Sequence, residues 1–323
     1  MAGRKNAAAQ ALPAGGRKTG LLHNTWKNRT LVFMVMPVVI LLILFNYIPM
    51  FGLTVAFKDF NYVDGILKSP WVGWKNFKFL FSMKDLSWRM LRNTVGYYLL
   101  FTAVGTVLNV ALAVALNRCG NAYFKKYSHA VMILPTFLSF IAVTYITDCF
   151  LSHNTGMLNA LLESLGKERV RWYAEAKYWP FILTLVSTWK GVGYGAVMYL
   201  SALSGIDQEL YEAADLDGAN GWQKVRYIEI PMLVSMICII TLLGVGGIMT
   251  SNTGLFYQVT KDSSLLYETT QTIDTYVLKT LVGGVTDFGP STAVTLFQSA
   301  VGCGVCLLAN WGVRRISPEN ALF

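Results

Sequence analysis

The chain has 323 residues, of which 54% are hydrophobic and 14% charged, and its formal net charge is +9. A soluble globular domain carries roughly 25% charged residues, so this composition excludes an ordinary soluble protein and predicts an all-α membrane protein. The basic residues lie between apolar stretches rather than along one face, which argues against binding to nucleic acid.

Residues 1–28 are rich in Ala, Gly, Arg and Lys and show no apolar periodicity. We expect them to form a mobile, basic, cytoplasmic arm. A signal peptide is disfavoured because the following uncharged stretch, Leu31 to Phe57, is longer than the roughly 7–15 residues of a signal's apolar region. Residues 29–323 are predicted to form one transmembrane domain.

Six apolar stretches come near the roughly 20 residues that a spanning helix needs. They predict helices near 31–57, 95–116, 130–148, 179–201, 230–250 and 292–311. An even number of helices places both termini on one side. The raw count of Lys and Arg gives no decisive asymmetry, but the short segments around Arg118, Lys224 and Arg314 favour a cytoplasmic location for both termini. The longer outer segments are partly apolar, which predicts interfacial helices.

The polar segment 205–229 separates the fourth and fifth stretches and is strongly acidic. Asp207 is suited to begin a helix and Gly218 to end it in the left-handed conformation. The small Ala213 and Ala214 allow another protein to approach closely. Nearby carboxylates offer charge to a basic partner; they include Glu212, Asp215 and Asp217. This pattern favours a docking helix over the alternative of a merely solvated loop.

The order Glu212-Ala213-Ala214, three residues, Gly218, nine residues, then Ile228-x-Ile230-Pro231 resembles the EAA loop of ABC importer permeases. The stretches Trp71-Val72-Gly73-Trp74-Lys75-Asn76-Phe77 and Arg92-Asn93-Thr94 are similar to segments of carbohydrate-uptake permeases. The resemblance implies the type I ABC importer permease fold with a cytoplasmic coupling helix that includes Asp215 and Asp217. It is greatest for permeases of oligosaccharides and polysaccharides, including acidic ones such as alginate.

The same resemblance implies the partners. They are a second permease subunit in a heterodimer, two ATPase subunits that use ATP and Mg, and an extracytoplasmic solute-binding protein that delivers the carbohydrate. The assembly is expected in the bacterial inner membrane.

Lys190 interrupts the fourth apolar stretch. A lysine at the centre of a spanning helix costs about 2.5–3.5 kcal/mol, so its charge must be buried in the bundle or in a wet cavity. It could line a translocation path and bind a carboxylated sugar, together with Trp189, Tyr194, Tyr199 and Asn252. Equally, it could extend toward a helix end or pair with Asp148 or a backbone carbonyl. Both interpretations remain open on the sequence.

The chain carries no G-x-x-x-x-G-K-[ST] motif, so we expect ATP hydrolysis in a separate subunit. No nucleophile and base converge within the helices, which argues against an intramembrane enzyme. His129 and His153 lack partners at a metal spacing, so no metal or other cofactor is expected in this chain. The alternative function is an ion-coupled secondary transporter of a small polar solute, which would need buried carboxylates; only Asp148 lies near a helix end.

Overall fold

The computed structural model describes residues 29–78, 82–283 and 288–322. The chain divides into two compact units, Met1–Thr54 and Val55–Phe323. In the described ranges every regular element is a helix, which confirms the predicted all-α class. The predicted basic arm at 1–28 lies outside the described residues.

The first unit contains the first apolar stretch. Here α2 (Arg29–Leu42) passes into a π turn, η1 (Ile43–Tyr47), and then into η2 (Ile48–Phe57), which continues into the second unit. Together they form a candidate membrane span of 29 residues. Residues 29–51 of this span are exposed, as for Phe33 at 75%, which suits a helix surrounded by lipid, whereas Val55 and Ala56 near its end are buried.

Four further candidate spans belong to the second unit. They contain α5 (Lys84–Asn117), α9 (Trp179–Ser204), α12 (Ile230–Val245) and α15 (Phe288–Ile316). The second predicted helix thus begins at Lys84 rather than at 95, and the fifth ends at Val245 rather than at 250. Residues after Val245 form turns instead, where Gly246 and Gly247 follow each other.

The predicted continuous helix over 130–148 does not hold. This stretch is divided among α6 (Ala122–Ile133), the short η4 (Leu134–Phe137) and α7 (Phe140–Leu151). The chain bends by 100° between them. Pro135 removes one backbone donor and disfavours a continuous helix. Ser139 starts the next helix by accepting a hydrogen bond from the Ala142 amide at 3.2 Å. The bent pair can count as one broken span, which would be the sixth.

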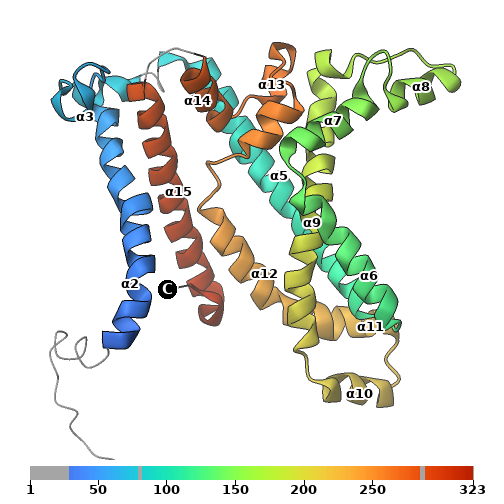
Figure 1. Cartoon of the computed structure of the whole chain (residues 1–323). Helices are drawn as coiled ribbons and strands as arrows, with labels where there is room; N and C mark the ends of the chain where they lie inside the picture. The colour runs from blue at the N-terminus through green and yellow to red at the C-terminus, as the bar shows by residue number, and fades with distance from the viewer. Residues whose placement is uncertain (1–28, 79–81, 284–287, 323) are drawn as a thin grey trace, which may run out of the picture. The chain divides into compact units, whose positions relative to one another are not determined.

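Short helices occupy the two ends of the second unit (Figure 1). One end carries α10 (Gln208–Leu216), α11 (Gly221–Lys224) and the π turn η7 (Val225–Glu229). The other end carries the remaining short elements: α3 (Gly65–Lys68), η3 (Gly73–Phe77), α8 (Met157–Ser164), η5 (Trp172–Ala174), η6 (Ala176–Tyr178), η8 (Gly254–Val259), η9 (Ser264–Leu266), α13 (Tyr267–Thr270) and α14 (Ile273–Val282). The last element of the chain is η10 (Pro318–Asn320).

Two apolar clusters stabilise the central helices. One surrounds Trp179 and Phe256, where α7, α9 and η8 meet. The other surrounds Tyr199 and Leu233, where α5, α9 and α12 meet. Between them α9 approaches α6 so closely that Gly193 has no room for a side chain: a Cβ there would overlap the Met132 carbonyl. The pocket described below lies in this central region.

The two permease-like stretches hold the fold together by side-chain hydrogen bonds to distant backbone. Asn76 donates to the carbonyls of Ala56 (3.0 Å) and Lys58 (2.9 Å), which anchors the chain after the first span. Asn93 donates to the carbonyls of Glu268 (3.1 Å) and Gln271 (3.0 Å), which ties α5 to α13. Both amides are buried, so these bonds satisfy their donors, and Arg92 donates a further bond to the Glu268 carbonyl at 3.0 Å.

Candidate coupling surface and central pocket

The acidic segment forms a helix pair whose ends are set by its own sequence. The Asp207 side chain accepts a hydrogen bond from the Glu209 amide at 3.1 Å and begins α10. Gly218 follows the helix with φ +72°, a conformation that side chains other than glycine's rarely adopt. Asn220 and Gln223 then exchange side-chain to backbone bonds of 2.6 and 2.9 Å at the start of α11.

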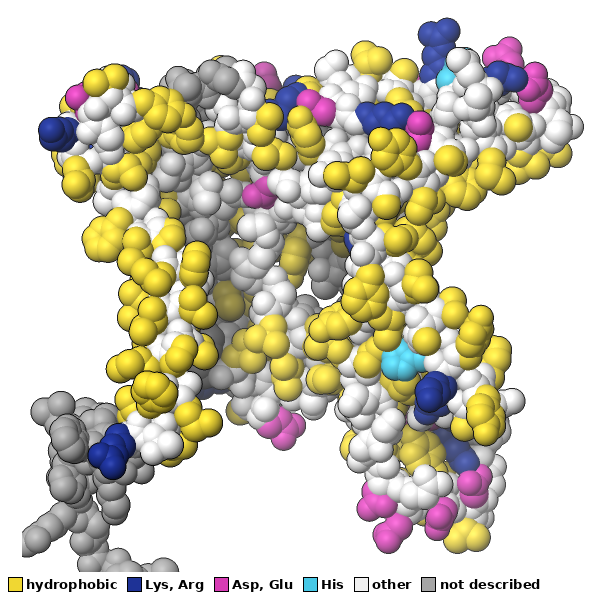
Figure 2. Space-filling model, viewed as in Figure 1, with side chains coloured by type: hydrophobic (Ala, Val, Ile, Leu, Met, Phe, Trp, Pro, Cys, Tyr) yellow, Lys and Arg dark blue, Asp and Glu magenta, His cyan; other side chains and the backbone are white. Residues whose placement is uncertain are grey.

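The side chains on this helix pair are largely free to meet a partner. Five exposed carboxylates gather over α10 (Figure 2): Asp207, Glu209, Glu212, Asp215 and Asp217. Among them stand three exposed apolar side chains, Leu210 (46%), Leu216 (91%) and Trp222 (69%). Ala213 is exposed and Ala214 is partly buried. Apolar side chains surrounded by charges of one sign are typical of a docking site for a basic protein surface. We call α10 and α11 with these side chains the α10–α11 surface.

One of the predicted docking carboxylates has a partner within the chain. Asp215 forms an ion pair with Lys224, which ties α10 to α11. The Asp215 side chain is still 66% exposed, whereas Lys224 is only 16% exposed. The pair therefore gives the helix pair a defined geometry and leaves Glu212 as a carboxylate that no described residue pairs.

A buried ion pair lies behind the α10–α11 surface. Arg118, at the end of α5, places its Nε 3.4 Å from Oε1 of Glu229, the last residue of η7. Nearby, Tyr211 of α10 has a raised pKa, chiefly because it is buried and also because Glu229 is negative; Asn117 and Arg118 oppose the shift. Sequence reasoning missed this pair, although a glutamate just before the apolar fifth helix was an available signal.

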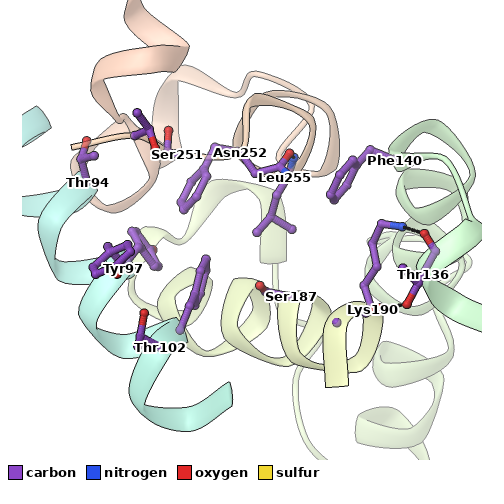
Figure 3. A pocket seen from close by; sticks show the side chains of 15 residues that line it. Thr94, Tyr97, Thr102, Thr136, Phe140, Ser187, Lys190, Ser251, Asn252 and Leu255 are labelled. Carbon is purple, nitrogen blue, oxygen red and sulfur yellow. Dashed lines mark hydrogen bonds between the residues drawn. The ribbon is translucent and has the colours of Figure 1, made fainter. Parts of the chain in front are cut away.

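The second feature is a pocket of about 390 Å³ between α5, the bend from η4 to α7, α9 and the segment around η8. Figure 3 shows the side chains that line it. Most are aromatic or carry a hydroxyl group. The lining comprises Thr94, Tyr97, Tyr98, Phe101, Thr102, Thr136, Phe140, Ser187, Lys190, Gly191, Thr250, Ser251, Asn252, Leu255 and Phe256.

Lys190 lines the pocket and is also paired within the chain. Its Nζ donates to the carbonyls of Pro135 (3.2 Å), Thr136 (2.8 Å) and Leu138 (2.6 Å). Asp148, the other partner considered for it, pairs instead with Lys261 at 2.5 Å. The lysine therefore pairs with backbone carbonyls at the break of the third span.

The predicted path residues do not all meet at the pocket. Lys190 and Asn252 line it, but Trp189, Tyr194 and Tyr199 do not. Trp189 and Tyr194 are exposed on α9, at 40% and 59%. Tyr199 is only 2% exposed and packs between α5, α9 and α12. It follows Lys190 by nine residues, or about 13 Å along a helix, which places it beyond the pocket.

Sequence reasoning also missed the face of α5 that lines the pocket. Tyr97, Tyr98, Phe101 and Thr102 are spaced so that they share one side of a helix. This spacing was an available signal. The opposite wall is held by Asp274, whose carboxylate accepts from the Ser251 amide at 2.6 Å and so positions the segment that includes Asn252.

Among the described residues, no three His, Cys, Asp or Glu side chains lie together as a metal site. The features of the second unit are thus the exposed, acidic α10–α11 surface at one end of a helix bundle and a pocket within it. Such an arrangement is typical of a membrane transport component.

Comparison with known proteins agrees with this class. Residues 105–318 match the family described as the binding-protein-dependent transport system inner membrane component. Protein LplB of Bacillus subtilis (strain 168) is 32% identical over 296 residues, which cover 91% of each chain. The polygalacturonan/rhamnogalacturonan transport system permease protein YteP of the same organism is 30% identical over 305 residues, or 94% of each chain.

A solved structure shows the same fold. It is that of a bacterial ABC transporter involved in the import of the acidic polysaccharide alginate, with a TM-score of 0.83 and 28% identity over 92% of this chain and 99% of that chain. The present chain therefore belongs to the family of binding-protein-dependent transport system inner membrane components. It is a multi-pass, non-catalytic permease subunit of the ABC importer class in the inner membrane, as its EAA-like stretch predicted.

Proposed function

We propose that this chain is the membrane-spanning subunit of an ATP-driven importer that passes an oligosaccharide or polysaccharide from a solute-binding protein into the cytoplasm. The observation that carries the proposal is the α10–α11 surface, on which Glu212, Ala213 and Gly218 of the EAA-like pattern are exposed at one end of the bundle. A surface of carboxylates and apolar side chains suits a basic cleft on one of two ATPase subunits, which would bind the ATP and Mg.

The distribution of charge supports one orientation in the membrane. Arg314 and Arg315 lie in the last turn of α15, and this helix ends at the same end of the second unit as α11 (Figure 1). Lys125 and Lys126 lie in α6, which begins close to the end of α5. Positive charge in short segments at one end of a bundle supports a cytoplasmic location for that end, and six spans would then leave both chain termini in the cytoplasm.

Movement of the α10–α11 surface would reach the spanning helices through rigid connections. Tyr211 of α10 lies at the Arg118–Glu229 pair, which joins α5 to the start of α12. A displacement of α10 by closure of the ATPase dimer would therefore be transmitted to two spanning helices at once. A second permease subunit, different from this chain, would complete the passage between the two membrane subunits.

The chemistry of the pocket supports a carbohydrate substrate. Sugar rings stack on aromatic faces and hydrogen-bond through their hydroxyls, and the pocket offers Tyr97, Phe101 and Phe256 beside Ser187 and Asn252. Its volume of about 390 Å³ falls within the roughly 300–1,000 Å³ of ligand pockets. The names of YteP and of the alginate transporter support an acidic polysaccharide such as polygalacturonan or alginate as the imported class. A neighbouring structure contains a pentasaccharide-bound periplasmic protein, which supports delivery by a solute-binding protein.

The test is reconstitution of this chain with its companion permease, ATPase and binding protein in proteoliposomes. We expect sugar uptake that needs ATP and the binding protein. Glu212→Lys should lower uptake and binding-protein-stimulated ATP hydrolysis about tenfold or more without lowering membrane insertion, because it reverses a docking charge. Glu168→Lys makes the same charge reversal on an exposed residue outside α10 and should leave both rates unchanged.

Two results would contradict the proposal. One is normal uptake by Glu212→Lys together with Gly218→Trp, which distorts the end of α10. The other is uptake that follows an ion gradient and ignores ATP, as a secondary transporter would require.

A further inference from the structure

The geometry at Lys190 points to a role different from anion binding. We infer that Lys190 is a positioning residue that holds the broken third span against α9, and that the pocket recognises the uncharged face of a sugar through aromatic rings, hydroxyls and an amide. This inference rests on the proposed function, because it specifies the substrate chemistry of the same pocket.

The first step is the hydrogen-bonding capacity of the ammonium group. A lysine ammonium has three N–H donors and no acceptor. Three backbone carbonyls, those of Pro135, Thr136 and Leu138, lie 2.6–3.2 Å from Nζ. The group also lies 5.1 Å from the centre of the Phe140 ring. No N–H donor remains to bind the carboxylate of an acidic sugar, as the approach of Lys190 to Thr136 in Figure 3 illustrates.

The second step is that the backbone carbonyls at the break between α6 and α7 favour a nearby cation. A bend of 100° separates α6 from α7, so the helical hydrogen-bond ladder is not continued after η4, although the Pro135 carbonyl still accepts from the Leu138 amide at 3.2 Å. Carbonyls at a helix end carry partial negative charge and bind cations favourably. A second hydrogen bond joins the same two residues, because Thr136 Oγ1 donates to the Lys190 carbonyl at 2.8 Å. Lys190 and Thr136 thus join α9 to the break from both sides.

The third step links the break to the pocket wall. Thr136 precedes the bend and Phe140 follows it, and both line the pocket. A side chain that determines the geometry of the bend therefore determines the distance between these two wall residues. One turn further along α9, Gly193 packs directly against the α6 backbone at Ile133. The wall is consequently held at two points along α9.

The last step is the charge of the remaining lining. Lys190 is the single charged residue among the described residues that line the pocket. The others contribute aromatic faces, hydroxyls such as those of Ser187 and Ser251, and the Asn252 amide. The Tyr97 hydroxyl is buried and has no hydrogen-bond partner within the described part of the chain, so Tyr97 contributes its ring rather than its hydroxyl to the pocket. With the ammonium already satisfied, the pocket offers uncharged partners to sugar hydroxyls and ring faces, and acidic groups are left unpaired.

The experiment compares two replacements of Lys190 in the complete reconstituted complex. Lys190→Met removes all three donors, whereas Lys190→Gln removes the charge but keeps two N–H donors for the carbonyls. Uptake is measured with neutral and uronate oligosaccharides of equal length. We expect Lys190→Met to lower the maximal rate about tenfold for both substrates, since it leaves carbonyls unpaired, and Lys190→Gln to restore much of both. The ratio of uronate to neutral uptake should stay within about twofold of wild type in both variants.

An anion-binding lysine predicts the opposite pattern. Both variants would then lose uronate uptake selectively and keep neutral uptake, and this result would overturn the inference. A second measurement, which does not depend on transport, tests the positioning role even if the complex imports something other than a sugar. The unfolding temperature of the purified chain, measured without ligand, should fall in Lys190→Met and recover in part in Lys190→Gln. An unchanged unfolding temperature in Lys190→Met would refute the positioning role, whereas absence of sugar uptake by the wild-type complex would refute only the proposed function.

Discussion

Arg118 Nε lies 3.4 Å from Glu229 Oε1, and only 1% of the Glu229 side chain is exposed. The pair joins the end of α5 to the π turn that leads into α12. Glu229 Oε2 has no hydrogen-bond partner among the described residues. The negative charge of this buried carboxylate is therefore balanced chiefly by Arg118. A glutamate buried beside α10 is therefore a connection whose loss affects two spanning helices.

The first prediction concerns this pair. Arg118→Gln leaves the Glu229 carboxylate buried without a cation, and we expect a loss of unfolding free energy of about 3–5 kcal/mol, the range for breaking a buried pair. Glu229→Gln should cost less, because Arg118 is 31% exposed and water can solvate its charge. Unfolding of the purified chain and a double-mutant cycle measure the coupling. Additive losses in the double variant would show that the two residues do not interact.

The second prediction concerns the close approach of α9 to α6. A Cβ at Gly193 would overlap the Met132 carbonyl and lie 2.7 Å from the Ile133 amide nitrogen, and backbone atoms cannot move aside as a side chain can. Gly193→Ala should therefore destabilise the chain by about 1–3 kcal/mol, as overpacking does. Gly191→Ala is the matched control, since nothing lies within 4 Å of its Cβ position. Equal unfolding temperatures for the two variants would contradict this packing.

The features that sequence analysis predicted well are local ones. Asp207 and Gly218 determine where α10 begins and ends through contacts within a few residues, so their roles can be read from the pattern alone. The spanning stretches were likewise visible, because apolarity over about 20 residues is a property of the stretch itself. The exposed acidic character of α10 followed directly from its composition.

The features that it missed depend on distant backbone. Lys190 binds carbonyls that lie 52–55 residues away in the chain, and a carbonyl has no signature in the sequence. The break at Pro135 was hidden because the stretch remains apolar throughout and proline is tolerated in spanning helices. Asn93 is similar, since the carbonyls that it binds are those of Glu268 and Gln271. Topology must be known before such partners can be identified.

The third prediction concerns Asn159, which is 1% exposed at the base of α8. Its Nδ2 donates to the Val170 carbonyl at 2.9 Å, and its Oδ1 accepts from the Val170 amide at 3.0 Å and from Trp172 Nε1 at 3.1 Å. Asn159→Leu leaves these buried groups unpaired at a cost of about 1–3 kcal/mol each.

We therefore expect local opening of segment 152–172, seen as faster amide exchange and proteolysis there, with the unfolding of the spanning helices little changed. Asn154→Leu is the control, because Asn154 is exposed in the same loop. Equal protection of the segment in both variants would contradict an organising role for Asn159.

The last prediction uses pH at the junction behind the α10–α11 surface. Burial raises the pKa of Tyr211, and the negative charge of Glu229 raises it further. Because the folded pKa exceeds the unfolded value of about 10, the stability that the neutral phenol contributes is complete below pH 10 and is lost as the pH rises toward the folded pKa. Tyr211→Phe cannot ionise, so the wild-type unfolding temperature should fall relative to that of Tyr211→Phe only above about pH 10. Tyr227→Phe serves as a control because Tyr227 is 70% exposed. A constant difference between wild type and Tyr211→Phe from pH 8 to about pH 11 would mean that the phenol is not buried at this junction.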